Sequence, residues 1–162
     1  DLKIANWAYQ MAALHGRYEI IRWLSENYGL IAENVRADDG HALLLAAKNG
    51  YFDILRFFVE RCELTVEDMR VYENFALRHS AYRGNLKVLQ WLAEKFGLTT
   101  EDARAEDNFA LRCSAGNGHL EVMQWLVKSF NLTPDDVRTW NNEALRSSAS
   151  GGLRRTPRPL PD

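Results

Sequence analysis

Histidines are the first residues to test for catalytic or metal-binding chemistry, because imidazole transfers protons near neutral pH and ligates metals. The chain has four, well separated from one another: His15, His41, His79 and His119. A zinc site needs clustered ligands at short characteristic spacings, and none of these spacings is present. We therefore expect no metal site, and we interpret the histidines as structural.

Other catalytic signatures are missing as well. The sequence contains no G-x-S-x-G motif, P-loop or dinucleotide fingerprint. The segment Gly116-Asn117-Gly118 is rich in glycine, but it lacks the third glycine of a phosphate-binding loop. The sequence therefore predicts a protein that is not an enzyme and uses no cofactor.

Arginines could bind an acidic ligand, and they recur at a spacing of 34 residues: Arg36, Arg70, Arg104 and Arg138. Acidic neighbours such as Glu101 and Asp102 would neutralise a basic ladder of this kind. A fixed spacing favours a structural role, such as a bond to helix C-terminal carbonyl groups or to a carboxylate of the next unit.

The elements that position these residues repeat with the same spacing. Glycines recur at Gly16, Gly50, Gly84, Gly118 and Gly152, and the segment Asn-Phe-Ala-Leu-Arg begins at both Asn74 and Asn108. In the third unit the pattern predicts a first helix over about 75–83, capped by Asn74, and a second over about 86–96. Gly84 can adopt positive φ and end the first helix. The small pair Ser80-Ala81 would let another helix approach closely.

The connector between units also carries helix signals. Thr65-Val66-Glu67-Asp68 and its equivalents at 99–102 and 133–136 begin with a threonine cap, which predicts a short third helical turn. Before this turn, Gly97-Leu98 has the pattern of a Schellman helix end. Glu63 occupies the glycine position in its unit, so we expect local strain there.

Aromatic side chains of the second helices share one position of the repeat: Trp23, Phe57, Trp91 and Trp125. They could serve as a stacking platform for nucleic-acid bases. Their common position on an amphipathic helix favours a core role between successive units.

The fourth unit resembles an ankyrin repeat at Ala110-Leu111, Ser114-Ala115, Gly118–Val122 and Trp125-Leu126. The tetratricopeptide repeat also has a period of 34 residues, but its aromatic and glycine placements are absent. The ankyrin resemblance implies an all-α solenoid of helix-turn-helix repeats, and the connector signals place a short helical turn where the family usually has a β-hairpin finger. It also implies that His119 bonds to neighbouring backbone.

The repeats define the expected organisation of the chain. Residues 1–152 form the array, with units starting near 6, 40, 74 and 108 and a partial fifth from 142, while 153–162 form an irregular or disordered tail. We interpret the chain as a fragment of a longer array. Its incomplete ends would expose apolar surface and favour self-association.

Composition limits the partners and the compartment. The net charge of −2, from 20 basic and 22 acidic residues, argues against nucleic acid, and no apolar run is long enough to span a membrane. Two cysteines without a secretory signal are typical of a reducing compartment, so we expect a cytoplasmic or nuclear protein that is not secreted.

The resemblance implies a scaffold that binds a protein partner through a concave groove formed by the first helices and the connectors. The alternative is an architectural spacer without a partner of its own. Positions that vary between units are the candidate partner-binding residues, because fixed positions build the stack. They are Asp38, Lys48, Asn49, Tyr72, Tyr82, Arg83, Glu106, Asn117 and Trp140.

Overall fold

A computed structural model describes residues 2–29 and 32–137 of the chain. The helices in these two ranges are α1 (Leu2–Leu14), α2 (Tyr18–Tyr28), α3 (Ala32–Asn49), α4 (Phe52–Arg61), α5 (Val66–Arg83), α6 (Leu86–Phe96), α7 (Thr100–Gly116) and α8 (Leu120–Ser129). There are no strands in the described ranges, and none of their helices is long and apolar enough to cross a membrane. The expected all-α class is confirmed.

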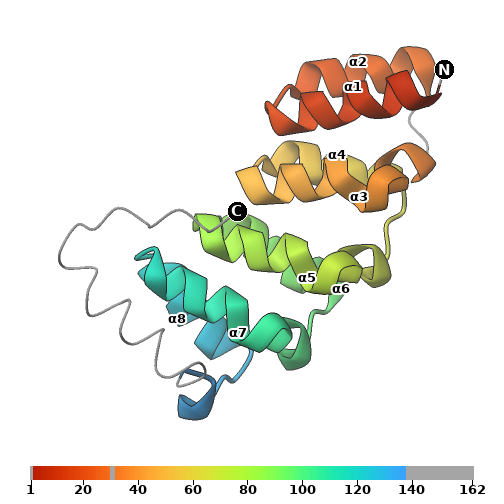
Figure 1. Cartoon of the computed structure of the whole chain (residues 1–162). Helices are drawn as coiled ribbons and strands as arrows, with labels where there is room; N and C mark the ends of the chain where they lie inside the picture. The colour runs from red at the N-terminus through yellow and green to blue at the C-terminus, as the bar shows by residue number, and fades with distance from the viewer. Residues whose placement is uncertain (1, 30–31, 138–162) are drawn as a thin grey trace, which may run out of the picture.

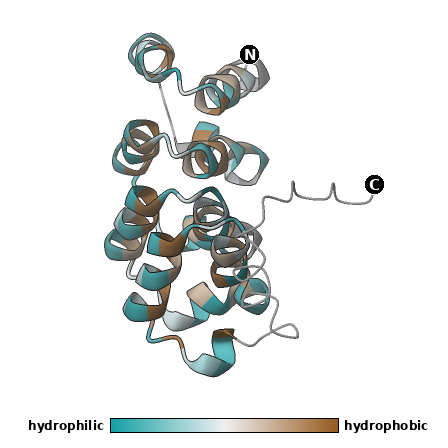
Figure 2. Cartoon of the chain, turned by 90° about the vertical axis from the view of Figure 1, so that its left-hand side faces the viewer, coloured by the Kyte–Doolittle hydropathy of each residue, from teal (hydrophilic) through white to brown (hydrophobic). Residues whose placement is uncertain are grey.

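The helices stack as consecutive antiparallel pairs (Figure 1). The odd-numbered helices α1, α3, α5 and α7 pack on one another in chain order, and each also packs on the even-numbered helix that follows it. In the view turned by 90° about the vertical axis, the odd-numbered and even-numbered helices form two columns (Figure 2). The expected helix-turn-helix solenoid is therefore present across the described units.

Small residues let the odd-numbered helices approach one another. Ala13, Ala47 and Ala81 recur at one position of the repeat, and each is fully buried. The Ser80 hydroxyl donates to the carbonyl oxygen of Ala47 in the preceding unit, 3.1 Å away. The small pairs thus permit close packing, and serine adds a hydrogen bond between units.

The connector contains the predicted helical turn, and α3, α5 and α7 are long because this turn runs into the first helix of the unit. In α7 the two parts meet at a left-handed segment, where Glu106, Asp107 and Asn108 have φ of 54°, 52° and 59°. Asn74 occupies the equivalent place in α5, with φ of 62°.

The expected N-cap role of Asn74 is wrong. A capping side chain bonds forward when its own backbone is extended, whereas Asn74 enters the helix from the left-handed region. Its Oδ1 is buried and accepts no hydrogen bond from the described residues. At Asn74 the left-handed backbone of the connector, and not a side-chain cap, leads into the second part of α5.

The ends of the even-numbered helices confirm the Schellman prediction. The amide of Leu98 donates to the carbonyl oxygen of Ala93 (3.1 Å), and Gly97 has φ of 60°. The same bond runs from Leu64 to Val59 (3.3 Å), which forces Glu63 to φ of 47°. Glu63 therefore carries the expected strain of a non-glycine residue in the left-handed region.

The predicted aromatic core of the even-numbered helices is only partly right. Trp91 is partly buried and packs edge-on against Phe52, with ring centroids 5.5 Å apart. Trp23 is 52% exposed, because its face of α2 lies at the end of the described stack. In α4, α6 and α8 the fully buried position is one residue further along the helix, at Phe58, Leu92 and Leu126.

Candidate partner-binding site

The repeated arginines join successive units. Arg36 donates through Nε and Nη2 to the two carboxylate oxygens of Asp68, at 2.6 and 2.9 Å. Arg70 pairs in the same way with Asp102 (3.0 and 3.2 Å), and Arg104 with Asp136 (2.7 and 2.9 Å). The predicted bond to a carboxylate of the next unit is confirmed for these three arginines, while Arg138 lies outside the described residues.

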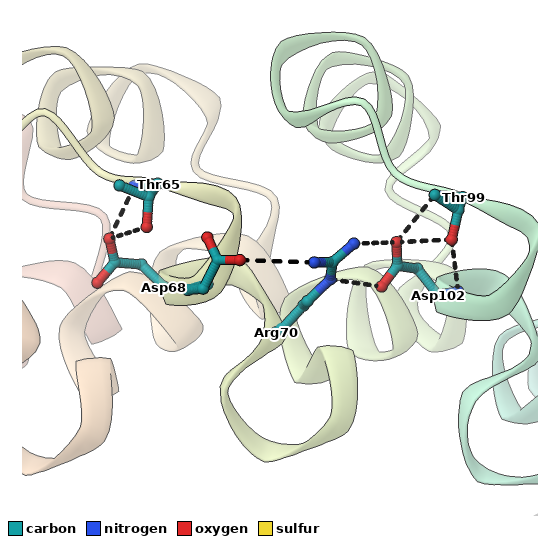
Figure 3. Close-up of polar contacts among 6 residues, drawn as sticks. Thr65, Asp68, Arg70, Thr99 and Asp102 are labelled. Carbon is teal, nitrogen blue, oxygen red and sulfur yellow. Dashed lines mark hydrogen bonds and ion pairs between the residues drawn. The ribbon is translucent and has the colours of Figure 1, made fainter.

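The same carboxylates cap the connector helices, as Figure 3 shows for Asp68 and Asp102. Asp102 Oδ2 accepts from the backbone amide of Thr99 (2.8 Å) and from its hydroxyl (3.1 Å). Burial would raise the pKa of Asp102, but the bonds from Arg70 and Thr99 outweigh burial and lower it. The arginine–aspartate ladder is therefore satisfied internally and is not a surface for an acidic ligand.

The turns between the paired helices also stack through side chains. His119 Nε2 donates to the carbonyl oxygen of Tyr82 in the preceding unit, 3.1 Å away, which confirms its expected backbone contact. In the unit before, Asn85 Nδ2 donates to the carbonyl oxygen of Lys48 (2.9 Å). These contacts hold the C-terminal ends of α3 and α5 in register.

Those helix ends carry most of the predicted partner-binding residues. Lys48 and Asn49 end α3, Tyr82 and Arg83 end α5, and Asn117 follows α7. Both asparagines donate to backbone carbonyl oxygens: Asn49 Nδ2 to that of Leu14 (3.5 Å) and Asn117 Nδ2 to that of Cys113 (2.8 Å). Lys48, Tyr82 and Arg83 remain as the stronger candidates for contact with a partner.

Of the other candidates, Asp38 and Glu106 lie inside α3 and α7, between the connector turn and the C-terminal part of each helix. Asp38 is exposed and accepts a hydrogen bond from Gln10 Nε2 at 2.6 Å. Glu106 lines an open depression together with Asn74, Ala105 and Asp107. The side chain of Tyr72 and the whole of Trp140 are not described. The described candidates thus form two groups. Those at the C-terminal ends of the odd-numbered helices are Lys48, Asn49, Tyr82, Arg83 and Asn117, and those near the connectors are Asp38 and Glu106.

A stack of rings on the odd-numbered helices was not predicted from the sequence. The His79 ring lies against Phe75, with centroids 3.6 Å apart, and 5.7 Å from the centroid of Phe109 in the next unit. The Tyr82 ring is tilted against His79, with centroids 6.3 Å apart. The signal was present, because rings recur at 34-residue spacing on the first helices: Trp7, His41, Phe75 and Phe109.

Lys48, His79, Tyr82 and Arg83 are called the groove face here, after the groove that the family resemblance implies, and this face carries two cations, Lys48 and Arg83. Burial, together with the positive charges of Arg78, Lys48 and Arg83, lowers the pKa of His79 to about 4. The imidazole is therefore neutral at physiological pH. Tyr82 is 37% exposed, and the guanidinium of Arg83 lies 6.0 Å from its ring centroid.

The stacked helix pairs define a helical repeat protein, and comparison with known families identifies its kind. Residues 43–137 match the model for ankyrin repeats in three copies, and residues 9–59 match a second model for ankyrin repeats in many copies. The chain belongs to the ankyrin-repeat family. No curated protein matches it. Ankyrin repeats are generally protein–protein interaction modules and are typically non-catalytic.

Proposed function

We propose that the chain is a non-catalytic scaffold that holds a protein partner against the groove face. The observation that carries this proposal is Tyr82, a partly exposed aromatic residue with the guanidinium of Arg83 6.0 Å from its ring and with Lys48 in the last turn of the adjacent helix α3. Tyrosine and arginine are among the residues most often found as interface hot spots. The cytoplasm or nucleus suits such a module, because the described cysteines are free thiols.

The difference between repeated and variable positions supports this function. Positions that repeat between units, such as Arg36, Arg70 and Arg104, are engaged in contacts between units. Positions that differ between units include Lys48 and Tyr82. Such variation is expected where a surface recognises a partner, since the stack itself does not require those side chains.

A quantitative affinity capture tests the proposal. The immobilised chain, its Tyr82→Ala and Arg83→Ala variants and a Gln124→Ala control on the exposed face of α8 are compared for the proteins they retain. Each captured protein is then purified and its direct binding measured. We expect one partner whose affinity falls at least about tenfold in both groove-face variants and is unchanged in the control. Unchanged affinity in the Tyr82 and Arg83 variants would contradict the proposal and favour the spacer.

The exposed end of the stack favours self-association as a second property. Ile20 on α2 is 50% exposed, whereas its equivalents Ile54, Val88 and Val122 are buried by the preceding unit. A second copy of the chain could cover this face. We expect Ile20→Glu to lower the sedimentation-average mass, with Leu120→Glu on α8 as the exposed apolar control. A wild-type monomer at all concentrations contradicts this expectation.

A further inference from the structure

We propose that the groove face recognises an acidic segment of the partner protein, one that brings carboxylates to Lys48 and Arg83 and an apolar side chain to Tyr82. This inference rests on the proposed function and specifies the chemistry of the partner. It begins from the position of the two cations. Lys48 lies in the last turn of α3 and Arg83 ends α5, so they stand on adjacent, directly packed helices.

Among the side chains that the structure describes, no carboxylate pairs with either cation of the groove face. Five other arginines in the described ranges pair with aspartate or glutamate, whereas Arg17 and Arg61 do not: the five are Arg22, Arg36, Arg56, Arg70 and Arg104. Neither Lys48 nor Arg83 forms a salt bridge with a described residue. An acidic partner would supply the missing opposite charge.

A structural role at helix ends is the main competing explanation for these cations, since positive side chains favour helix C-termini. The other units do not support it. Neither α1 nor α7 has a basic residue in its last turn, and the positions equivalent to Lys48 are Leu14 and Gly116. The stack thus forms without cations at these ends, and the charges are specific to the middle units.

The environment of His79 reflects the same two cations, Lys48 and Arg83, together with Arg78. The charged groups that act on its ring are Arg78, Lys48 and Arg83, and all three are cations. Because the His79 imidazole stays neutral, it adds no further positive charge. Its ring instead extends the apolar stack of Phe75 and Phe109 beside these cations. The surface therefore combines aromatic area with positive charge, which suits a segment that mixes acidic and apolar residues.

Nucleic acid fits this surface less well than an acidic protein segment. Phosphate-driven binding requires many neutralised phosphates, and the chain as a whole carries a net charge of −2. Two cations without a salt bridge to a described side chain, together with one exposed tyrosine, match a short peptide stretch in scale. A phosphate polymer is therefore an outcome to be tested and not the proposed ligand.

Fluorescence anisotropy with defined peptides tests the proposal. The probes are a labelled twelve-residue peptide of glutamate and leucine and the same peptide with lysine in place of glutamate. We expect the full chain to prefer the acidic peptide, and Lys48→Gln/Arg83→Gln to weaken that binding at least about tenfold. The charge reversal Lys48→Glu/Arg83→Glu should invert the preference. Lys95→Gln/Lys128→Gln removes two exposed cations from α6 and α8 and should leave binding unchanged.

Three outcomes of the peptide measurements would overturn the proposal: no preference for the acidic peptide, an equal loss in the Lys95/Lys128 control, or tighter binding of a single-stranded oligonucleotide that depends on the same two cations. Circular dichroism establishes that every variant retains its helices. Loss of the natural partner in Tyr82→Ala but not in Lys48→Glu/Arg83→Glu would refute the acidic segment while leaving the proposed function intact. Retention in both would refute the two together.

Discussion

Arg70 and Asp102 connect two successive units through paired hydrogen bonds of 3.0 and 3.2 Å, and the same aspartate caps the connector helix of its own unit. One carboxylate therefore serves the local helix start and the interface between units at once. Because Asp102 is only 5% exposed, its charge depends on these partners. The pair links the formation of each connector to the stacking of its neighbour.

Replacement of Asp102 by asparagine should therefore destabilise the array. The change keeps the shape of the side chain but removes the charge that Arg70 and the Thr99 amide stabilise, which should lower the free energy of unfolding by about 1–2 kcal/mol. Urea denaturation followed by circular dichroism measures this. Glu101→Gln alters the adjacent exposed carboxylate and should have little effect. Equal losses in the two variants would show that general charge, and not the paired geometry, matters.

The turn at Gly84 gives a second prediction. Gly84 has φ of 75°, and a Cβ there would lie 2.6 Å from Nδ1 of His119. Gly84→Ala should cost about 1 kcal/mol for the backbone and a further 1–3 kcal/mol for the displaced ring. Gly97→Ala is the matched control, because Gly97 has φ of 60° with no atom within 4 Å of the added Cβ. Thermal unfolding should rank the two variants in that order, and the reverse order would contradict the role assigned to His119.

The sequence alone predicted most of the architecture, because residues that recur at a fixed spacing indicate which positions have the same structural role in every unit. Recurrence of the arginines at 34-residue spacing favours a structural ladder over a ligand site, because a fixed spacing implies the same contact in every unit. Threonine and aspartate three residues apart indicated the connector helix correctly, since a capping box is a local interaction. Glu63 was recognised as strained because its sister positions carry glycine or asparagine.

Features that depend on tertiary packing were not predicted as well. Asn74 has the residue type of an N-cap, but its backbone conformation is set by the left-handed connector and not by its own side chain. Trp23 occupies the same position of the repeat as Trp91. Trp23 would need a preceding unit to bury it as Trp91 is buried. The ring stack of Phe75, His79 and Phe109 combines two helices, so inspection of single helices missed it.

The buried His79 predicts how stability depends on pH. Its pKa is about 4 in the folded chain against 6.5 for the free group, so the unfolded chain binds more protons between these values. The free energy of unfolding should therefore fall as pH decreases from about 6.5 towards 4. The full shift corresponds to about 3 kcal/mol, and partial exposure to solvent reduces the expected loss to about 1–2 kcal/mol.

Urea midpoints measured between pH 7.5 and pH 4.5 test this dependence. The range lies above 3.8, the ordinary pKa of the paired aspartates, whose folded pKa values are lowered further, so their contribution stays nearly constant across it. His79→Gln removes the titrating ring and should flatten the profile. A profile as steep as that of the wild type would assign the pH dependence to another group.

The repeat also provides a matched pair of isoleucines for measuring how much the interface between units stabilises the stack. Ile54 and Ile20 occupy the same position of α4 and α2, but Ile54 is 2% exposed and Ile20 is 50% exposed. Ile54→Ala should cost about 2–5 kcal/mol through lost burial and a residual cavity, whereas Ile20→Ala should cost under about 1 kcal/mol at a concentration where the chain is monomeric. Denaturation of both variants, repeated at a higher concentration, completes the comparison. A rising cost for Ile20→Ala with concentration would show that a second copy covers α2, and equal costs in dilute solution would contradict the burial difference between the two units.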